Sequence, residues 1–201
     1  MSSTNTIILE DKLDDIFQYL PAMVVSENSE GYKPVFHFGD EHEIKVFLKK
    51  YELEKRKPYP LIWLLYPFKE KHIGKTLQLE DLPLILAVDT DKNLSSKLRL
   101  KTTYKKVLIP LMNMVVESLT KASTVKINKE REFVKFPNYS DDLLSGEENF
   151  TGARWDAIKL YLSFSINNGC LREIKMKGNQ EQQLEINIPA ISTGLNNVLK
   201  I

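Results

Sequence analysis

Cysteine, histidine, excess charge of one sign and long apolar segments are all scarce in this chain of 201 residues. Its one cysteine, Cys170, cannot form an internal disulfide bond, and residues 1–10 lack the basic and then apolar order of a secretory signal. We therefore expect the chain to be made and folded in a reducing cytoplasm. The longest apolar runs, residues 60–68 and 82–88, are less than half of the roughly 20 residues that a membrane-spanning helix needs. We expect no membrane segment.

The charges nearly cancel, because 28 lysine and arginine residues stand against 27 acidic residues and leave a formal net charge of +1. No overall field draws such a chain to DNA, RNA or an anionic bilayer. Hydrophobic residues make up 42% and charged residues 27%, which is an ordinary globular composition. The sequence predicts one domain over residues 1–188 and an apolar tail over residues 189–201, which we expect to contact a neighbour.

Residues that could hold a metal or a phosphate are few and scattered. His37, His42 and His72 show no ligand spacing, and a single cysteine excludes a zinc site made of thiolates. Residues 74–76 end like a phosphate-binding loop, but Lys69 stands where the first glycine of that loop is required. The sequence therefore predicts no metal and no cofactor.

Catalytic candidates are equally weak. Ser145 and Cys170 lack the sequence context of an activated nucleophile. Asp89 and Asp91 form the one arrangement that resembles a metal-binding acidic pair, at the end of an expected strand. The favoured interpretation is a turn that caps the following helix, because Asp and the intervening Thr90 are preferred at such positions. We expect no catalytic residue.

Helical periodicity predicts a first helix over residues 6–20 and a second over residues 41–54. The second has the clearest start, because Asp40 can cap it while Glu43, three residues later, reaches back toward the cap. A third helix is predicted over residues 95–121. Pro110 should kink or divide it, because proline has no amide hydrogen to donate.

Strand patterns lie between and after these helices. Residues 32–38 predict a short strand that Pro34 restricts to a sheet edge. Residues 59–66 are apolar on both faces, as in a central strand, and a polar turn over residues 69–75 leads to an antiparallel neighbour over residues 77–89.

The second half of the chain predicts further strands. Strict alternation over residues 155–166 indicates a half-buried strand, with Ile158 to Ile166 facing inward at every second position and Lys159 facing outward. A long surface loop is expected over residues 137–152. Further short strands are expected over residues 124–127, 133–136, 170–176 and 184–188. The order of elements predicts an α+β fold with an antiparallel or mixed β-sheet and flanking helices.

Four stretches carry a family resemblance, namely residues 59–68, 84–91, 104–111 and 155–158. Over residues 32–166 the chain resembles structural proteins of tailed phages infecting Bacteroidetes, of the neck and tail-terminator kind. The resemblance implies a tail-terminator-like α+β subunit of the virion, assembled in the host cytoplasm, with no enzymatic activity. It also implies a homo-oligomeric ring, sixfold or twelvefold, that joins the head-side connector to the tail around the DNA channel. Neighbouring neck, portal-side or tail proteins would be its partners, and DNA would pass only as non-specific cargo.

Two other classes stay open. A monomeric or dimeric adapter that binds one partner protein would show the same scarcity of catalytic residues. A metal-dependent nuclease that uses Asp89 and Asp91 would require a divalent ion for its activity.

Overall fold

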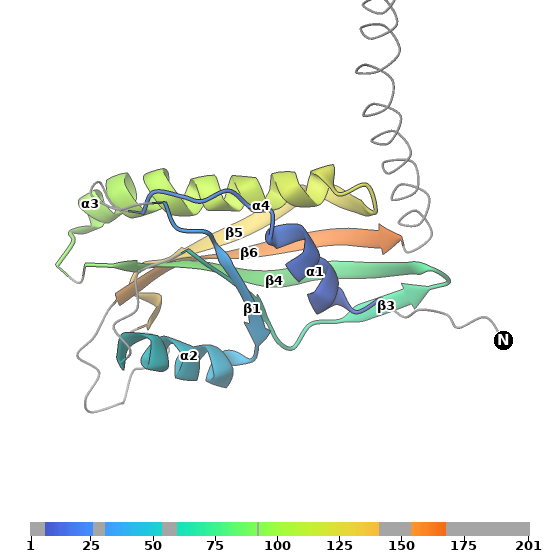
Figure 1. The fold of residues 1–201 in the computed structure, drawn as a ribbon, viewed down its shortest axis with the longest axis horizontal. Coiled ribbons are helices and arrows are strands. Elements are labelled where there is room, and N and C mark those ends of the chain that lie inside the picture. Colours follow the sequence, from blue (N-terminus) through green and yellow to red (C-terminus); the bar gives the residue numbers. More distant parts are fainter. Residues whose placement is uncertain (1–6, 26–30, 54–59, 92, 141–153, 168–201) are drawn as a thin grey trace, which may run out of the picture.

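The computed structural model describes residues 7–25, 31–53, 60–91, 93–140 and 154–167 (Figure 1). Within these residues a six-stranded mixed sheet has the order β1-β2-β4-β6-β5, and β3 pairs with β4 beside this path. β1 is parallel to β2, and all other neighbours are antiparallel. The expected α+β class with a mixed sheet is confirmed. The strands are β1 (Val35–Gly39), β2 (Leu61–Leu65), β3 (Glu70–Ile73), β4 (Thr76–Thr90), β5 (Val125–Phe136) and β6 (Arg154–Asn167).

Two short helices and one long helix pack on this sheet. The short ones are α1 (Leu9–Phe17) and α2 (Glu41–Leu53). The long helix is continuous through three segments, α3 (Ser96–Arg99), the π-helix η1 (Leu100–Leu108) and α4 (Ile109–Lys121). No helix in the described residues is long and apolar enough to span a bilayer.

Pro110 explains the change of winding inside the long helix. The proline lies in the first turn of α4, directly after the π-helical segment. It cannot donate to the carbonyl group four residues earlier, and its ring crowds that carbonyl. The preceding residue, Ile109, donates its amide hydrogen to the carbonyl of Tyr104, five residues back, which is the wider π-helical bond. Pro110 was expected to kink or divide the helix; the helix instead continues through it, and its winding changes from π to α at Ile109.

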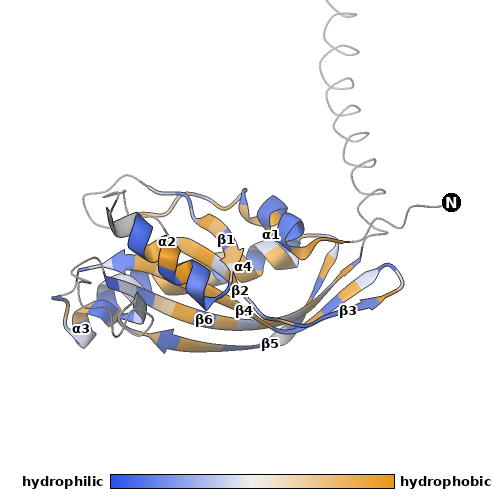
Figure 2. Ribbon diagram, turned by 90° about the horizontal axis from the view of Figure 1, so that it is seen from below, coloured by the Kyte–Doolittle hydropathy of each residue, from blue (hydrophilic) through white to orange (hydrophobic). Residues whose placement is uncertain are grey.

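The sheet has two faces with different cover. The helix face is the one on which α1 and the long helix pack, and the α2 face is the opposite one (Figure 1). β2 is buried throughout, with Ile62 and Leu64 on the helix face and Leu61, Trp63 and Leu65 on the α2 face. Its prediction as a central strand is confirmed. Seen from below, α2 lies over the β1 and β2 end of the sheet, and no described helix covers the other end (Figure 2).

The start of α2 follows the predicted capping pattern. Glu43 donates its backbone N–H to Asp40 Oδ1 at 2.8 Å, and Asp40 donates its own N–H to Glu43 Oε2 at 2.9 Å. Gly39 precedes this pair with a φ of 149°, and a Cβ there would lie 2.3 Å from Glu43 Oε2. The reciprocal cap therefore needs glycine at position 39 as well as the two acidic side chains.

β1 and β6 also confirm their predictions. β1 is the edge strand that Pro34 indicated. β6 alternates as expected, because Ile158, Leu160 and Leu162 are buried on the helix face while Lys159 and Tyr161 are only partly buried on the other.

Several expectations were wrong in detail. α1 spans Leu9–Phe17, so it is shorter at both ends than the helix predicted over residues 6–20, and Ile8 just before it is exposed. The predicted turn before β4 contains strand β3, so that only Gly74 and Lys75 remain as the two-residue turn of a hairpin, with a φ of 59° at the glycine.

The segment between the long helix and β6 also differs from its prediction. The two short strands expected over residues 124–127 and 133–136 are one strand, β5, with an irregularity between Ile127 and Arg131 that absorbs the polar residues between them. The third and fourth residues of the expected surface loop, Tyr139 and Ser140, are buried. The rest of that loop, the strands expected after Asn167 and the tail of residues 189–201 lie outside the described residues.

Candidate functional site

The strand order of the sheet ends in two different edge strands, β1 and β5, while the short β3 beside this order pairs only with β4 among the described strands. Both edges expose large apolar side chains, Phe38 on β1 and Phe133 and Val134 on β5. On the helix face an unbroken series of ring contacts runs from Phe17 of α1 through Phe36 to Phe38, with centroid distances of 5.4 and 6.3 Å. Each end of the sheet is therefore a candidate for contact with another protein.

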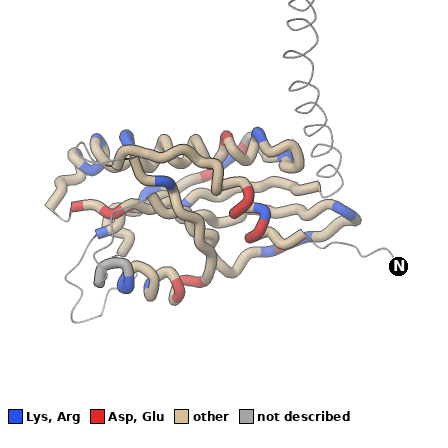
Figure 3. Tube along the Cα trace, viewed as in Figure 1, with Lys and Arg blue, Asp and Glu red and all other residues tan. Residues whose placement is uncertain are grey.

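Charged side chains also gather at separate places along the molecule. Acidic residues lie on α1, and lysines follow the first half of the long helix (Figure 3). A nearly neutral total charge therefore conceals two surfaces of opposite sign.

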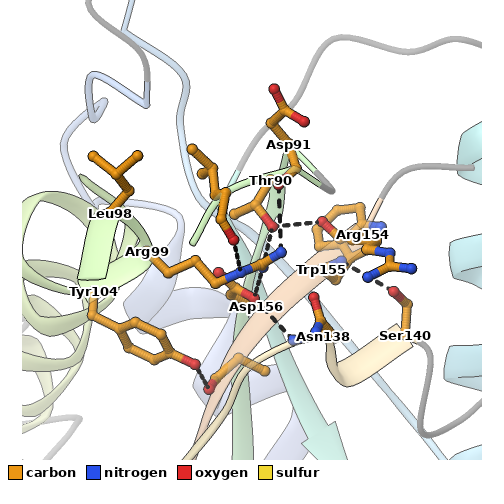
Figure 4. A network of polar contacts seen from close by, with 12 residues as sticks. Thr90, Asp91, Leu98, Arg99, Tyr104, Asn138, Ser140, Arg154, Trp155 and Asp156 are labelled. Atoms are coloured by element: carbon orange, nitrogen blue, oxygen red, sulfur yellow. Dashed lines mark hydrogen bonds and ion pairs between the residues drawn. The ribbon is translucent and has the colours of Figure 1, made fainter. Parts of the chain in front are cut away.

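A buried ion pair connects the long helix with the sheet (Figure 4). Arg99 is 4% exposed and Asp156 is fully buried, and Arg99 Nη1 lies 2.5 Å from Asp156 Oδ1. Arg99 also donates to the carbonyl groups of Leu94 and Asp91 and to the hydroxyl of Thr90. The guanidinium group thus holds the start of the long helix, the end of β4 and the start of β6 together.

The carboxylate of Asp156 also reaches the segment after β5. Asn138 donates its backbone N–H to Asp156 Oδ1 at 2.9 Å, from a residue with a φ of 60°. Among the described residues, Asp156 Oδ2 and Asn138 Oδ1 are buried without a hydrogen-bond partner. A single carboxylate that is already compensated by an arginine is a structural pair and lacks the several anionic ligands of a divalent metal site.

Tyr104 lies beside this pair. Burial raises the pKa of the Tyr104 hydroxyl above its usual range, the negative charge of Asp156 raises it further, and Arg99 opposes both effects. The hydroxyl donates to the carbonyl of Ala157 at 3.4 Å. It remains protonated at neutral pH and acts as a hydrogen-bond donor to β6.

Sequence reasoning missed this network, although one signal was present. Asp156 has the same alternation phase as Ile158 and Leu160, which places a carboxylate on the buried side of a strand. A buried carboxylate needs a positive or hydrogen-bonding partner. The partner, Arg99, is 57 residues away in the chain, and no local pattern identifies it.

The acidic pair singled out from the sequence has a local structural role. The Asp91 carboxylate accepts the backbone N–H of Asn93 at 2.8 Å, which is a turn of the kind that favours Asp. The helix cap itself is Ser95, whose hydroxyl accepts the N–H of Leu98. In the described part of the chain no three His, Cys, Asp or Glu residues, Asp89 and Asp91 included, are grouped so that they could hold a metal ion.

The histidines lie on three different elements. His37 of β1 packs against Phe47 and Trp63, with ring centroids 4.8 and 5.9 Å away. His42 is exposed on α2, and His72 of β3 lies 3.1 Å from the carboxylate of Glu70.

Of the remaining sequence candidates, only residues 74–76 belong to the described part of the chain. The stretch of residues 74–76 is the hairpin turn and the first residue of β4, and Ser145 and Cys170 lie outside the described residues. The described structure thus gathers none of these candidates into one site, and its two sheet edges are the features that distinguish its surface. No protein-family model, curated protein or solved structure matches this chain.

Proposed function

We propose that this protein is a non-enzymatic structural subunit of a tailed-phage virion, which forms a ring in the neck or tail around the DNA channel. The ring would join the head-side connector to the tail. The family resemblance over residues 32–166 supports this proposal, and the stretch that carries it extends from β1 into β6, which includes both edge strands and the long helix.

The observation that carries the proposal is the pair of dissimilar sheet edges. A protein that associates through one self-complementary surface forms a twofold dimer, whereas two different surfaces on one subunit produce head-to-tail association. Head-to-tail association closes into a ring where the rotation between neighbours permits it. β1 and β5 lie at opposite ends of the strand order and differ in length and sequence, as such a subunit requires.

Both edges also carry features that prevent indiscriminate strand pairing. Pro34 precedes β1, and β5 contains an irregularity and several charged residues. Such features protect an edge strand from aggregation. Association at these ends is therefore expected to depend on specific side-chain surfaces, with the free backbone groups in a secondary role.

Native mass spectrometry tests the proposal. The full chain, mixed with its candidate neck and tail partners, should give a cyclic oligomer of six or twelve copies, because the ring must match the rings on either side. Electron micrographs of the same mixture should show rings with a central channel. A chain that stays monomeric in every such mixture would exclude the ring.

Native mass spectrometry of the same mixtures also tests the alternative that the protein is an adapter. An adapter would form a complex with one or two copies of this chain and one partner, without a cyclic species. Such a result would assign the exposed edges to a partner protein.

A further inference from the structure

One side of α1 forms an acidic surface with apolar residues at both ends. Ile8, Asp11, Asp15 and Tyr19 follow one another at spacings of three or four residues and are all exposed, Ile8 at 55% and Tyr19 at 82%. Asp11 and Asp15 lie on the same side of α1, because they are four residues apart, while Ile8 directly precedes the helix and Tyr19 lies two residues beyond its end. The one lysine of α1, Lys12, lies 3.8 Å from Asp15. We call the side chains of Ile8, Asp11, Asp15 and Tyr19 the acidic α1 surface.

The first half of the long helix forms a surface of opposite charge. Lys97, Lys101 and Lys105 are exposed at intervals of four residues, and two exposed leucines lie beside them, Leu98 at 47% and Leu100 at 43%. We call these five residues the basic stripe. No described residue forms an ion pair with its three lysines. Like charges at this spacing repel one another and destabilise a helix. A partner of opposite charge would therefore weaken a repulsion that destabilises the helix in the isolated chain.

The two surfaces lie on elements that cover the same face of the sheet, at separate places along the molecule. α1 lies beside β1, because the rings of Phe17 and Phe36 are 5.4 Å apart. The π-helical segment packs mainly on β4 and β6, and Lys135 Nζ of β5 lies 5.6 Å from the ring centroid of Tyr104. Figure 3 shows the acidic residues of α1 and the lysines of the long helix apart from each other along the molecule. The two surfaces of one copy therefore do not contact each other, whereas the acidic α1 surface of one copy can contact the basic stripe of the next in a head-to-tail arrangement.

We propose that the acidic α1 surface of one copy docks on the basic stripe of the next copy. This inference rests on the proposed ring and names its subunit contact. Ile8 and Tyr19 on one side and Leu98 and Leu100 on the other supply apolar area, which provides most of the affinity of protein interfaces. The charges around them select the partner surface and its orientation.

A second copy fits the basic stripe better than a nucleic acid does. Phosphate groups would engage the lysines but leave Leu98 and Leu100 beside a polar backbone, since contacts to DNA are dominated by charge. The chain itself carries the complementary surface, where the carboxylates of Asp11 and Asp15 lie between the exposed side chains of Ile8 and Tyr19.

Charge reversal tests the contact in the full chain by sedimentation velocity. The wild-type protein should self-associate in a concentration-dependent manner at low salt, and added salt should weaken the association. One variant carries Lys101→Glu and Lys105→Glu, and the other carries Asp11→Lys and Asp15→Lys. Each alone should associate roughly tenfold or more weakly, because matching charges now repel. An equimolar mixture should regain wild-type association, because each variant complements the other on both surfaces.

A matched control changes the same number of charges outside both surfaces. Lys71 of β3 and Lys75 of the following hairpin turn are exposed, and their double replacement by Glu should leave association unchanged. Circular dichroism should show that all variants keep the wild-type fold, since the reversed residues are exposed. Variants that associate like the wild type, or a mixture that does not recover, would refute the contact.

Two further results would refute the contact and distinguish it from the proposed ring. The first is a wild-type chain that remains monomeric at low salt. The second is binding of a short DNA duplex in fluorescence anisotropy that disappears in the variant with Lys101→Glu and Lys105→Glu. Charge-reversed variants that still form cyclic oligomers with the neck partners would refute this contact alone. The absence of any cyclic oligomer in wild-type mixtures would refute the ring itself.

Discussion

The two faces of the sheet differ in how much of their length a helix covers. The long helix has twice the thirteen residues of α2, and together with α1 it covers apolar side chains from β2, β4 and β6. α2 covers a smaller cluster around Trp63 and Trp155, to which β2, β4 and β6 contribute. Further along β6, from Lys159 onward, the side chains on the α2 face are partly exposed. The helix face is therefore expected to dominate stability, while the α2 face tolerates polar residues.

Substitutions at two neighbouring residues of β6 test this difference and should give the largest change in stability. Leu160→Asp should prevent folding at neutral pH, because it places a charge without a partner in the fully buried helix-face core. Lys159→Asp changes the next residue, whose side chain lies on the partly exposed α2 face. It should cost about 1 kcal/mol or less, mainly through loss of the contact between Lys159 Nζ and the Tyr161 ring at 5.5 Å.

Soluble yield and thermal unfolding followed by circular dichroism provide the measurement for this pair. The order of the two effects is the decisive result. Greater damage from Lys159→Asp than from Leu160→Asp would mean that β6 presents the other set of side chains to the long helix.

The buried ion pair should give the next largest effect. Asp156→Ala leaves the Arg99 guanidinium group buried without its carboxylate, which costs about 3–5 kcal/mol in comparable pairs. Urea unfolding of the full chain should show this loss as a lower midpoint with an unchanged slope.

A double variant separates the charge from the packing. Arg99→Met with Asp156→Leu removes both charges and should recover most of the stability, because apolar replacements of a buried pair are often neutral or better. A double variant as unstable as Asp156→Ala alone would show that the hydrogen bonds to Thr90 and Asn138 matter more than the charges.

Local sequence patterns were sufficient for much of this fold. The alternation of β6, the reciprocal cap of Asp40 and Glu43 and the edge position that Pro34 imposes on β1 all involve residues close together in the chain. Each pattern reflects a local physical constraint, namely strand periodicity, unsatisfied amide groups at a helix start, or a missing donor.

Features that depend on distant residues were not predictable in the same way. The partner of Asp156 comes from another element. The polar residues between the two ends of β5 led to the prediction of two short strands where the structure has one. The basic stripe and the acidic α1 surface required the structure as well, because only the fold shows which side of each helix is exposed and that the two surfaces lie apart along the molecule.

Substitutions in the N-terminal cap of α2 test the stability of the α2 face. Asp40→Ala removes the acceptor for the Glu43 N–H and should cost about 1 kcal/mol. The control is Glu41→Ala, an acidic residue of the same first turn, which should cost roughly 0.3–0.5 kcal/mol through the helix dipole alone. Equal losses in thermal unfolding would indicate that charge near the helix start, and not the reciprocal cap, stabilises α2.

His37 should give the smallest effect, and it depends on pH. Burial lowers the pKa of His37 below its ordinary value of 6.5, although the nearby charge of Asp14 partly opposes this. Between the folded pKa and 6.5, the unfolded chain binds a proton that the folded chain does not, so stability falls as the pH drops through this window. His37→Phe keeps an aromatic ring between Phe47 and Trp63 and should remove this part of the slope. His42→Gln, at an exposed position of α2, should retain it. Thermal unfolding at closely spaced pH values provides the comparison, and identical slopes in the wild type and His37→Phe would show that the packing of His37 on the α2 face does not disfavour its charged form.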